Sequence, residues 1–567
     1  MIFSVLFALI VNLFRILAAP LVLLRRARAA PSGAWVRLVI DGGLVVMAPP
    51  RSRLPWAPRP TGLALDRVRE LVTALLADPR PRGLLVTLSS LSAAPALRTA
   101  LRDELARVRA AGRPLVVHLP LGGSTAELFV ASVADRVLVG VETSLGPLGF
   151  SRGSLYFRRA LDRVGLVPEV HAAGEYKSAG EPLLRDGMSD EQREQSGRLL
   201  DGLHEELVTA LETGRGLTRE SAARAIDRGL VSAAAALELG LADAIVHDDE
   251  VAHALERERS EKKAVLVPAA FYLRRRAATV FRRVLPRRKI AVVALHGAIL
   301  ERAPMPLSNV CEAEKIAPVL LALEDDPSVV AVVLHVDSPG GGVLASEKIH
   351  RAVARLAKKK PVVACMGGVA ASGGYYVSAP TACIVAAPTT ITGSIGVVAA
   401  RVVAGPFLAR FGVSYDSVRR GARAEMLSPL HDLDEGERVA FDAEIERAYR
   451  RFVAIVAEGR RRTVEEIDLL ARGRVWSGVD AHARGLVDRL GGLEVALEEA
   501  RSRANAPEAD AILLAPRAPI RPLSLARLLP IGALEALGFA PWVDVASLTL
   551  GARDRVWAVA LIDRQLS

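Results

Sequence analysis

The chain contains few cysteine and aromatic residues, and each scarcity excludes a class of function. Its three cysteines, Cys311, Cys365 and Cys383, are too few and too scattered for a disulfide framework or a CxxC metal site. We therefore expect neither a metal nor a cofactor. Aromatic residues make up 4% and do not interleave with basic residues in a stripe, which argues against nucleic acid as a partner despite the net charge of +11. The positive charge fits attraction to a membrane surface better.

Lysine is also scarce, with nine residues against 65 arginines. Lys177 is the only lysine among the first 261 residues. A guanidinium cannot lose its proton in a protein, whereas a buried ammonium can shift its pKa toward neutrality. A solvated surface lysine is the commonest explanation of such a residue. The isolation of Lys177 among arginines nevertheless hints that this position needs an amine.

The N-terminal stretch 2–24 is apolar except for Asn12 and Arg15, and it is long enough to span a bilayer. We predict an uncleaved transmembrane anchor over residues 1–29. A cleavable signal peptide is the alternative, but the positively charged start of such a peptide is missing. A cluster of arginines follows the apolar stretch, and the positive-inside rule alone would place the rest of the chain in the cytoplasm.

Two breaks in composition divide the remainder of the chain. Residues 30–60 are rich in proline and arginine and contain an opening strand at 35–40. Residues 251–289 alternate apolar and cationic side chains, which is typical of an interfacial amphipathic segment or of a solvated connector. We predict an N-terminal repeat over 30–250, a basic linker over 251–289, a C-terminal repeat over 290–505 and a tail over 506–567. The tail either packs as an amphipathic helix or touches the membrane.

The two halves of the chain are related by an internal repeat. A shift of 247 positions pairs residues 114–182 with residues 361–429 without a gap. The turn residues that are identical in both halves are Pro114 and Pro361, Gly146 and Gly393, Gly149 and Gly396, Gly165 and Gly412, Gly174 and Gly421, and Pro182 and Pro429. Shared turn residues mean shared turns, so both halves should have one fold.

The hydrophobic pattern of each half alternates between strands and helices. In the second half, apolar β-branched runs at 290–295, 329–336, 361–365 and 384–386 are separated by amphipathic stretches near 313–324 and 345–358. Continuous apolar runs without alternation indicate parallel strands buried on both faces. The sequence therefore predicts the α/β class, with two tandem copies of one domain after an N-terminal transmembrane helix.

A glycine-rich turn, Asp337-Ser338-Pro339-Gly340-Gly341-Gly342, directly follows one of these buried strands. Glycines let the backbone present its N–H groups with no side chain in the way, as an oxyanion pocket requires. The corresponding stretch of the first half, Ser89–Ala93, has lost the glycines. Only one half has kept this turn.

Ser372 lies between a predicted strand and a predicted helix, with small residues on both sides. The N–H groups at a helix N-terminus favour developing negative charge. An ordinary N-cap serine is the alternative, but the flanking glycines favour the close approach of a substrate backbone. In the first half, Thr125 occupies the matching position and is followed by Ala126 and Glu127.

Lys177 shows the reciprocal pattern, since its repeat partner is Ala424. The half that keeps the serine and the glycine turn has lost the lysine, and the other half has lost the serine and the glycines. A serine hydroxyl needs a base to become a nucleophile, and a desolvated neutral lysine can supply it. We predict a single site in which Ser372 and Lys177 approach hydrogen-bond distance, closed either within one chain or between two.

At this point the residues resemble a known family. Val336–Gly341, Ala370–Tyr376, Thr392–Gly396 and Gly174–Pro182 are similar to motifs of the long, duplicated form of signal peptide peptidase A, and the resemblance covers roughly residues 35–505. It implies a fold like that of the caseinolytic protease and crotonase superfamily. It also implies a membrane-bound serine endopeptidase that degrades signal peptides and other apolar peptides.

The resemblance further implies roles for individual residues. Ser372 would be the nucleophile and Lys177 the general base. The backbone N–H groups of Gly340 or Gly341 and of Gly373 would hold the oxyanion.

The resemblance also implies a bacterial inner-membrane location, with the catalytic part in the periplasm, and a bowl-like homotetramer. This orientation conflicts with the arginines that follow the anchor. Four motifs in order outweigh a short arginine cluster, so we expect the periplasmic orientation.

The sequence also leaves two alternative functions and one alternative catalytic triad open. His335 and Asp337 lie on one face of a strand and suggest a Ser-His-Asp triad, although a histidine in an apolar strand is usually a packing residue. An acyl-coenzyme A enzyme of the same superfamily would want a carboxylate near the glycine turn and no serine–lysine pair. A non-catalytic membrane scaffold would need neither Ser372 nor Lys177.

Overall fold

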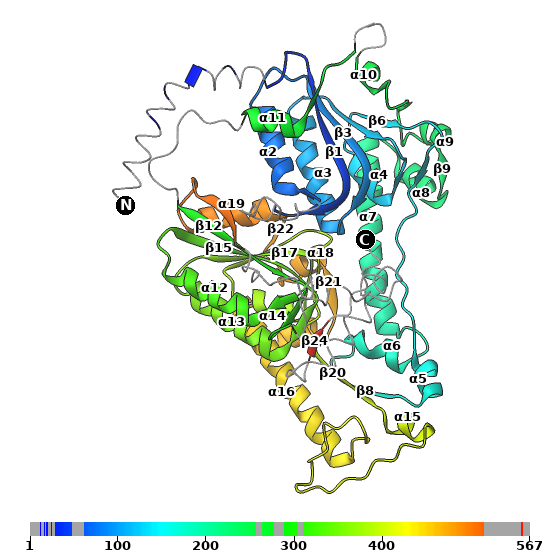
Figure 1. The fold of residues 1–567 in the computed structure, drawn as a ribbon, viewed down its shortest axis with the longest axis vertical. Helices are drawn as coiled ribbons and strands as arrows, with labels where there is room; N and C mark the ends of the chain where they lie inside the picture. Colours follow the sequence, from blue (N-terminus) through cyan, green and yellow to red (C-terminus); the bar gives the residue numbers. More distant parts are fainter. Residues whose placement is uncertain are drawn as a thin grey trace. The chain divides into compact units, whose positions relative to one another are not determined.

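The computed structural model describes residues 29–47, 62–256, 263–276, 288–303, 310–514 and 557–559, together with five isolated positions before residue 29. These residues belong to two compact units (Figure 1). The first unit comprises residues 1–151 and 201–287, and the second comprises residues 152–200 and 288–566. By sequence, residues 152–200 belong to the first repeat, but in space they are part of the second unit.

The first unit contains a parallel sheet with the strand order β10-β6-β4-β3-β1-β11. The strands are β1 (Trp35–Val45), β3 (Gly83–Ser92), β4 (Leu115–Leu119), β6 (Arg136–Val139), β10 (Ala244–Ile245) and β11 (Leu266–Pro268). The main helices are α2 (Leu65–Leu76), α3 (Pro95–Ala110) and α4 (Thr125–Ala131). All five residues of β4 are buried, as expected for a strand covered on both faces.

Part of the predicted basic linker contributes to the core of this unit. Strand β11 pairs with β1, and helix α11 (Ala269–Arg276) follows it. Tyr272 of α11 is fully buried, and its hydroxyl donates a hydrogen bond to the Ala74 carbonyl at 3.0 Å. Residues 266–276 of the predicted linker are therefore part of the first unit.

The second unit repeats the same architecture with the order β21-β19-β17-β15-β12-β23. The strands are β12 (Lys289–His296), β15 (Val329–Ser338), β17 (Val362–Ala371), β18 (Cys383–Ala386), β19 (Ile391–Gly393), β21 (Val475–Ser477) and β23 (Asp510–Leu514). Helices α12 (Ala313–Asp325) and α13 (Val343–Ala357) lie on one side of the sheet, and α19 (Leu493–Arg503) lies on the other (Figure 1). The predicted α/β class is confirmed, because β12, β15, β17 and β18 form at the four apolar runs and pair in parallel.

A second sheet in this unit has the order β14-β13-β16-β24-β20-β8. Its strands are β8 (Val167–Ala173), β13 (Ala298–Leu300), β14 (Val310–Glu312), β16 (Gly340–Gly342), β20 (Val397–Val403) and β24 (Trp557–Val559). Strands β8 and β20 pair antiparallel over their whole length, from Val397 opposite Ala173 to Val403 opposite Val167. Because Lys177 follows β8 and Ser394 precedes β20, this pairing brings the lysine loop to the second unit.

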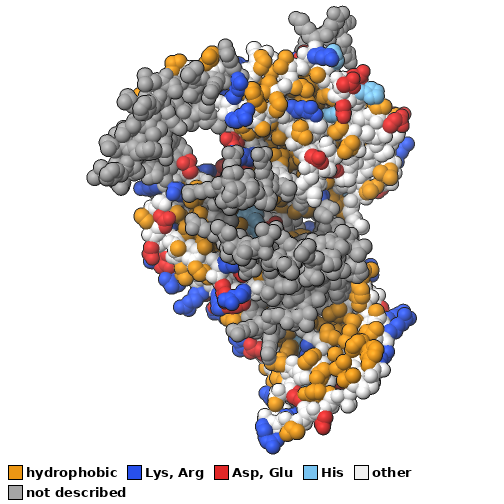
Figure 2. All heavy atoms as spheres, in the orientation of Figure 1, with side chains coloured by type: hydrophobic (Ala, Val, Ile, Leu, Met, Phe, Trp, Pro, Cys, Tyr) orange, Lys and Arg blue, Asp and Glu red, His pale blue; other side chains and the backbone are white. Residues whose placement is uncertain are grey.

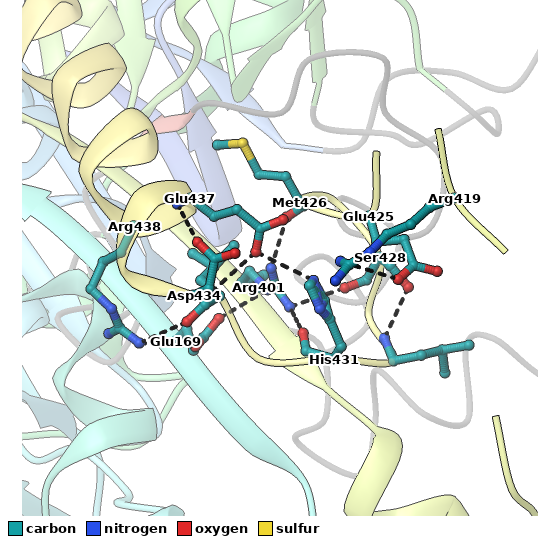
Figure 3. A network of polar contacts seen from close by, with 12 residues as sticks. Glu169, Arg401, Arg419, Glu425, Met426, Ser428, His431, Asp434, Glu437 and Arg438 are labelled. Atoms are coloured by element: carbon teal, nitrogen blue, oxygen red, sulfur yellow. Dashed lines mark hydrogen bonds and ion pairs between the residues drawn. The ribbon is translucent and has the colours of Figure 1, made fainter. Parts of the chain in front are cut away.

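A network of charged side chains fixes the same pair of strands (Figure 3). Arg401 on β20 forms an ion pair with Glu169 on β8 at 3.0 Å. The Arg401 guanidinium also donates to the carbonyls of Met426, at 2.8 Å, and Ser428, at 3.0 Å. These carbonyls lie in the stretch that is the repeat partner of the lysine loop, so the loop that lost its lysine is held by Arg401.

The transmembrane anchor predicted over residues 1–29 falls almost wholly outside the described residues. In the part of the chain that the structure describes, no helix has the length and apolarity needed to cross a membrane.

In the first unit, Glu127 occupies the place of a glycine of the serine motif. Ser124 is the N-cap of α4, and its N–H donates to the Glu127 carboxylate at 2.8 Å. The other carboxylate oxygen accepts the N–H of Leu91 at 2.7 Å, in the stretch that corresponds to the glycine turn of the other half. In the half that lacks the serine and the glycine turn, the Glu127 carboxylate thus accepts backbone N–H groups at the corresponding position.

We expect Glu127→Ala to destabilise the first unit, because the buried N–H of Leu91 and the partly exposed N–H of Ser124 would lose their acceptor. Each unsatisfied buried donor costs about 1–3 kcal/mol. Hydrogen-exchange mass spectrometry should report faster exchange in peptides that cover β3 and α4. Glu220→Ala, at a side chain that is 81% exposed on α8 (Arg219–Asp227), is the matched control. Unchanged exchange in Glu127→Ala would show that the carboxylate does not hold these donors.

Candidate active site

Ser372 occupies a strained turn between β17 and the helix α14 (Gly373–Ser378). Its φ of 54° and ψ of −117° are unfavourable for a residue with a side chain, and such a backbone costs of order 1–3 kcal/mol. It is the N-cap of α14, but its side chain makes no capping hydrogen bond. The ordinary N-cap explanation therefore does not account for this serine. The Ser372 N–H donates to the Gly393 carbonyl at 2.8 Å, which fixes the turn.

The glycines after Ser372 allow the start of α14 to contact the glycine turn. A Cβ at Gly373 would lie 3.1 Å from the Gly341 nitrogen and 3.2 Å from the Gly340 Cα. A Cβ at Gly374 would lie 2.9 Å from the Ser338 carbonyl oxygen. The sequence predicts the approach of a substrate backbone here, whereas in the structure the chain's own backbone makes the close contact.

The three glycines predicted to hold an oxyanion therefore lie together. Gly340 has a φ of 110°, a conformation that residues with side chains rarely adopt. Its N–H donates to the Ser338 Oγ at 3.1 Å, inside the turn. Of the three predicted donors, the Gly340 N–H is therefore already engaged within the turn.

The Lys177 amine lies against the Ser372 hydroxyl, within a single chain and within the second unit. The Nζ–Oγ distance is 3.0 Å. The amine also lies 3.0 Å from both the hydroxyl and the carbonyl oxygen of Ser394. All three partners are uncharged oxygen atoms. They take up the three positions around Nζ that hold three protons in the ammonium form, or two protons and the lone pair in the neutral amine.

Burial makes this amine chemically unusual. Lys177 is only 6% exposed, and the removal of water lowers its pKa from 10.5 to about 7. Desolvation disfavours the charged form of any amine. Near neutral pH, a substantial fraction of the Lys177 side chain is therefore neutral and can accept a proton.

A second loop clamps the lysine in place. A Cβ at Gly473 would lie 2.6 Å from the Lys177 Cβ, so only a glycine fits there. The Tyr176 N–H donates to the Arg472 carbonyl at 2.9 Å. The Arg474 guanidinium lies 4.6 Å from the Tyr176 ring and 4.5 Å from the Trp476 ring, within the range of cation–π contacts. No sequence pattern indicates this clamp, because its members lie about 300 residues apart in the chain.

Ser394 was likewise given no role from the sequence, although it lies in the motif Thr392–Gly396. Its φ is 50°, and its N–H donates to the Arg474 carbonyl at 2.7 Å. The clamp loop therefore also positions the residue that orients the Lys177 amine. The sequence shows Ser394 between Gly393 and Gly396, but residue spacing does not indicate which residue Ser394 contacts.

His335 and Asp337 have partners other than Ser372. The His335 Nδ1 lies 2.7 Å from the Nε2 of His296, and burial lowers the pKa of His335 to about 3. One Asp337 oxygen accepts the Val369 N–H at 3.0 Å. These contacts favour a packing role over a triad.

No cluster of histidine, cysteine and carboxylate side chains suitable for a metal occurs among the residues that the structure describes. The three cysteines are buried, and none of them forms a disulfide within the described part of the chain. The groups assembled at the site are a strained serine, a neutral amine and glycine N–H donors. This set can carry out acyl transfer through a covalent intermediate.

Comparison with known proteins agrees with this chemistry. Peptidase family S49 matches residues 107–262 and 354–507, one region in each repeat, and the Clp protease family matches residues 305–388. The chain is 33% identical to Protease 4 of Salmonella typhi, over 77% of this chain and 73% of that protein. It is 32% identical to Protease 4 of Haemophilus influenzae, over 76% of this chain and 71% of that protein.

A plant protein has a similar extent of likeness. The chloroplastic serine protease SPPA of Arabidopsis thaliana is 31% identical, over 79% of this chain and 67% of its own length. The family match in both repeats, the extent of these relatives and the serine with its neutral amine lead to one assignment: the chain belongs to peptidase family S49, in its long duplicated form, and is a serine-type peptidase.

Proposed function

We propose that the chain hydrolyses peptide bonds with Ser372 as nucleophile and Lys177 as general base. The observation that carries this proposal is the 3.0 Å contact between the Ser372 hydroxyl and a buried amine whose pKa is about 7. A general base works best when its pKa lies near the operating pH and it is within hydrogen-bond reach of the proton it removes. Lys177 meets both conditions.

In the proposed reaction, the neutral Lys177 amine takes the hydroxyl proton as Ser372 Oγ bonds to the scissile carbonyl carbon. The N–H groups of Gly341 and Gly373 stabilise the oxyanion. The intermediate collapses, the C–N bond breaks, and the Lys177 ammonium gives its proton to the leaving amine. A water molecule then attacks the ester, with Lys177 again accepting a proton and returning it to Ser372. Ser394 keeps the amine directed at Ser372 throughout.

We propose that the substrates are apolar peptides, among them signal peptides. Support comes from the resemblance to the signal peptide peptidase A family and from the relative named SPPA. We also propose that residues 1–29 anchor the protein in the bacterial inner membrane with the catalytic part in the periplasm. The apolar stretch 2–24 supports an anchor, while the orientation rests on the resemblance.

We further propose a homotetramer, as the resemblance implies. Apolar side chains gather on the surface of the second unit, in the lower part of Figure 2. Phe411 is 71% exposed and Val418 is 89% exposed, and Val413 and Leu427 are also exposed. Contiguous exposed apolar side chains mark contact surfaces, and this surface is our candidate for contact with a neighbouring copy.

The dyad predicts that Ser372→Ala and Lys177→Arg each abolish cleavage of an apolar fluorogenic peptide. Loss of a nucleophile or its base typically costs a factor of about 10⁴ or more in kcat. Arginine keeps the positive charge but cannot be deprotonated, so Lys177→Arg separates base catalysis from charge. Lys358→Arg, on the exposed C-terminal end of α13, is the matched control and should retain full activity. Near-normal activity of either site variant would rule out the mechanism.

The lowered pKa of Lys177 predicts how activity depends on pH. The amine is protonated and inactive below its folded-state pKa and neutral above it. A profile of kcat/KM against pH should therefore rise with pH, with a midpoint at about 7. A midpoint near 10.5, the ordinary value for lysine, would contradict the burial argument.

A further inference from the structure

A buried glutamine on helix α7 (Asp190–Arg215) bonds to the loop that carries the proposed base. Gln195 is only 5% exposed and lies in the part of α7 that belongs to the second unit. Its amide nitrogen donates to the Tyr176 carbonyl and to the Ser178 hydroxyl, each at 3.1 Å. Its amide oxygen accepts the N–H of Val475 at 3.1 Å. One uncharged side chain therefore binds three groups from two separate segments of the chain.

Two of these partners flank Lys177, which itself lies outside the helices and strands. Within the loop, the Lys177 N–H donates to the Gly174 carbonyl at 3.1 Å, and the Ser178 N–H donates to the Tyr176 carbonyl at 2.8 Å. These two bonds shape the loop but do not attach it to the rest of the unit. Gln195 attaches the loop directly before and directly after the lysine.

The third partner directly follows Arg474 of the clamp loop. Val475 is the first residue of β21 and lies opposite Gly393 of β19. The Arg474 carbonyl accepts the Ser394 N–H at 2.7 Å, and the Ser394 hydroxyl lies 3.0 Å from the Lys177 amine. Gln195 thus joins the loop that supplies the amine to the strand beside the amine's other partner.

The internal repeat shows the same reciprocal loss at this position as at the lysine. Helices α7 and α16 (Glu435–Arg460) each have 26 residues, and a shift of 245 positions aligns them from end to end. The positions identical in both helices are Arg193 and Arg438, Val208 and Val453, Gly214 and Gly459, and Arg215 and Arg460. Gln195 then corresponds to Ala440, in the half where Ala424 replaces the lysine. The glutamine is present in the half that has the lysine and absent from the other.

The charges around the lysine loop are paired with one another. The titratable side chains that flank Lys177 in its loop, in the clamp and on α7 are Glu175, Tyr176, Glu194, Arg472 and Arg474. Arg472 lies 3.6 Å from Glu175, and Arg474 pairs with Glu194, which also accepts the Tyr176 hydroxyl at 3.0 Å. Burial is what lowers the pKa of Lys177, and an amide, unlike a carboxylate, can hold the loop without adding a charge beside it.

We propose that Gln195 is a positioning residue of the Ser372–Lys177 site. It holds the backbone on both sides of Lys177 against β21 and the clamp loop, which keeps the amine within reach of the Ser372 hydroxyl and out of contact with water. The inference deepens the proposed function and rests on it, since Gln195 acts only through Lys177. A loop that loses this amide admits water to the amine, and water restores the charged form.

Gln195→Met tests the proposal, because methionine fills a similar volume without an amide. The full-length protein in detergent is assayed for kcat/KM against pH with an apolar fluorogenic peptide. We expect the midpoint of the profile to move from about 7 to about 8 or higher. Since one unit of pKa changes the protonation equilibrium tenfold, the activity at pH 7 should fall about fivefold and recover at higher pH. A loss of stability alone would lower the activity at every pH without moving the midpoint.

Gln192→Met is the matched control. Gln192 is also 5% exposed and lies on α7, but its amide oxygen accepts the Tyr156 hydroxyl at 3.2 Å, outside the lysine loop and the clamp. This variant should keep the midpoint at about 7. Ser178→Ala is a second test variant, which removes one Gln195 hydrogen bond at a half-buried residue and leaves α7 unchanged. It should move the midpoint in the same direction as Gln195→Met, and by less.

The carbon-13 signal of the Lys177 Cε gives the same midpoint without turnover. If the wild type titrates at about 7, an unmoved midpoint in Gln195→Met overturns the positioning role, as does an unmoved midpoint in Ser178→Ala where Gln195→Met does not fold. An equal shift in Gln192→Met would overturn it too, because any change inside α7 would then have the same effect. A wild-type midpoint near the ordinary lysine value of about 10.4 would instead contradict the dyad, and this inference with it.

Discussion

The contact between the Lys177 amine and the Ser372 hydroxyl constrains everything around it. A lysine can accept a proton near neutral pH only if water is removed from it, because desolvation is what disfavours its charged form. A buried amine must still find hydrogen-bond partners, and an uncompensated one would destabilise the fold. Ser394 supplies two oxygen atoms and Ser372 a third, all uncharged. A carboxylate in their place would stabilise the ammonium and raise the pKa.

The need to bury the Lys177 amine beside Ser372 explains how the chain is divided between its two units. Residues 152–200 leave the repeat to which they belong by sequence and join the second unit. Strand β8 is fixed by its ladder with β20 and by the Glu169–Arg401 ion pair. Gly473 then permits the approach of Lys177 that a larger residue would block. In the first unit, Glu127 accepts the N–H groups of Leu91 and Ser124, which lie in the stretches that correspond to the glycine turn and the serine motif of the other half. These features agree with a single active site in a chain that contains two copies of the fold.

Much of the fold could be predicted because the signals were local. Strands β12, β15, β17 and β18 form where apolar runs were found, and the glycines at 341 and 373 are needed for close packing. The repeat comparison also singled out Ser372 and Lys177, which the structure brings to hydrogen-bond distance.

The rest depends on contacts between distant parts of the chain. No periodicity indicates that Arg474 will lie between Tyr176 and Trp476, or that Ser394 will orient an amine 217 positions away. The transfer of residues 152–200 to the second unit was also invisible, because the gapless repeat alignment of residues 114–182 runs straight across residue 152. Glu127 could be seen to replace a glycine, but not to bind Leu91.

The protonation state of Lys177 is the central claim, and it can be measured directly. The chain has only nine lysines, so a sample labelled with carbon-13 at the lysine Cε gives few NMR signals to follow against pH. Lys177→Arg identifies the signal of interest by its loss. We predict that this one signal titrates with a midpoint at about 7, well below the ordinary lysine pKa of about 10.4. A midpoint of the Lys177 signal near the ordinary value would contradict the account.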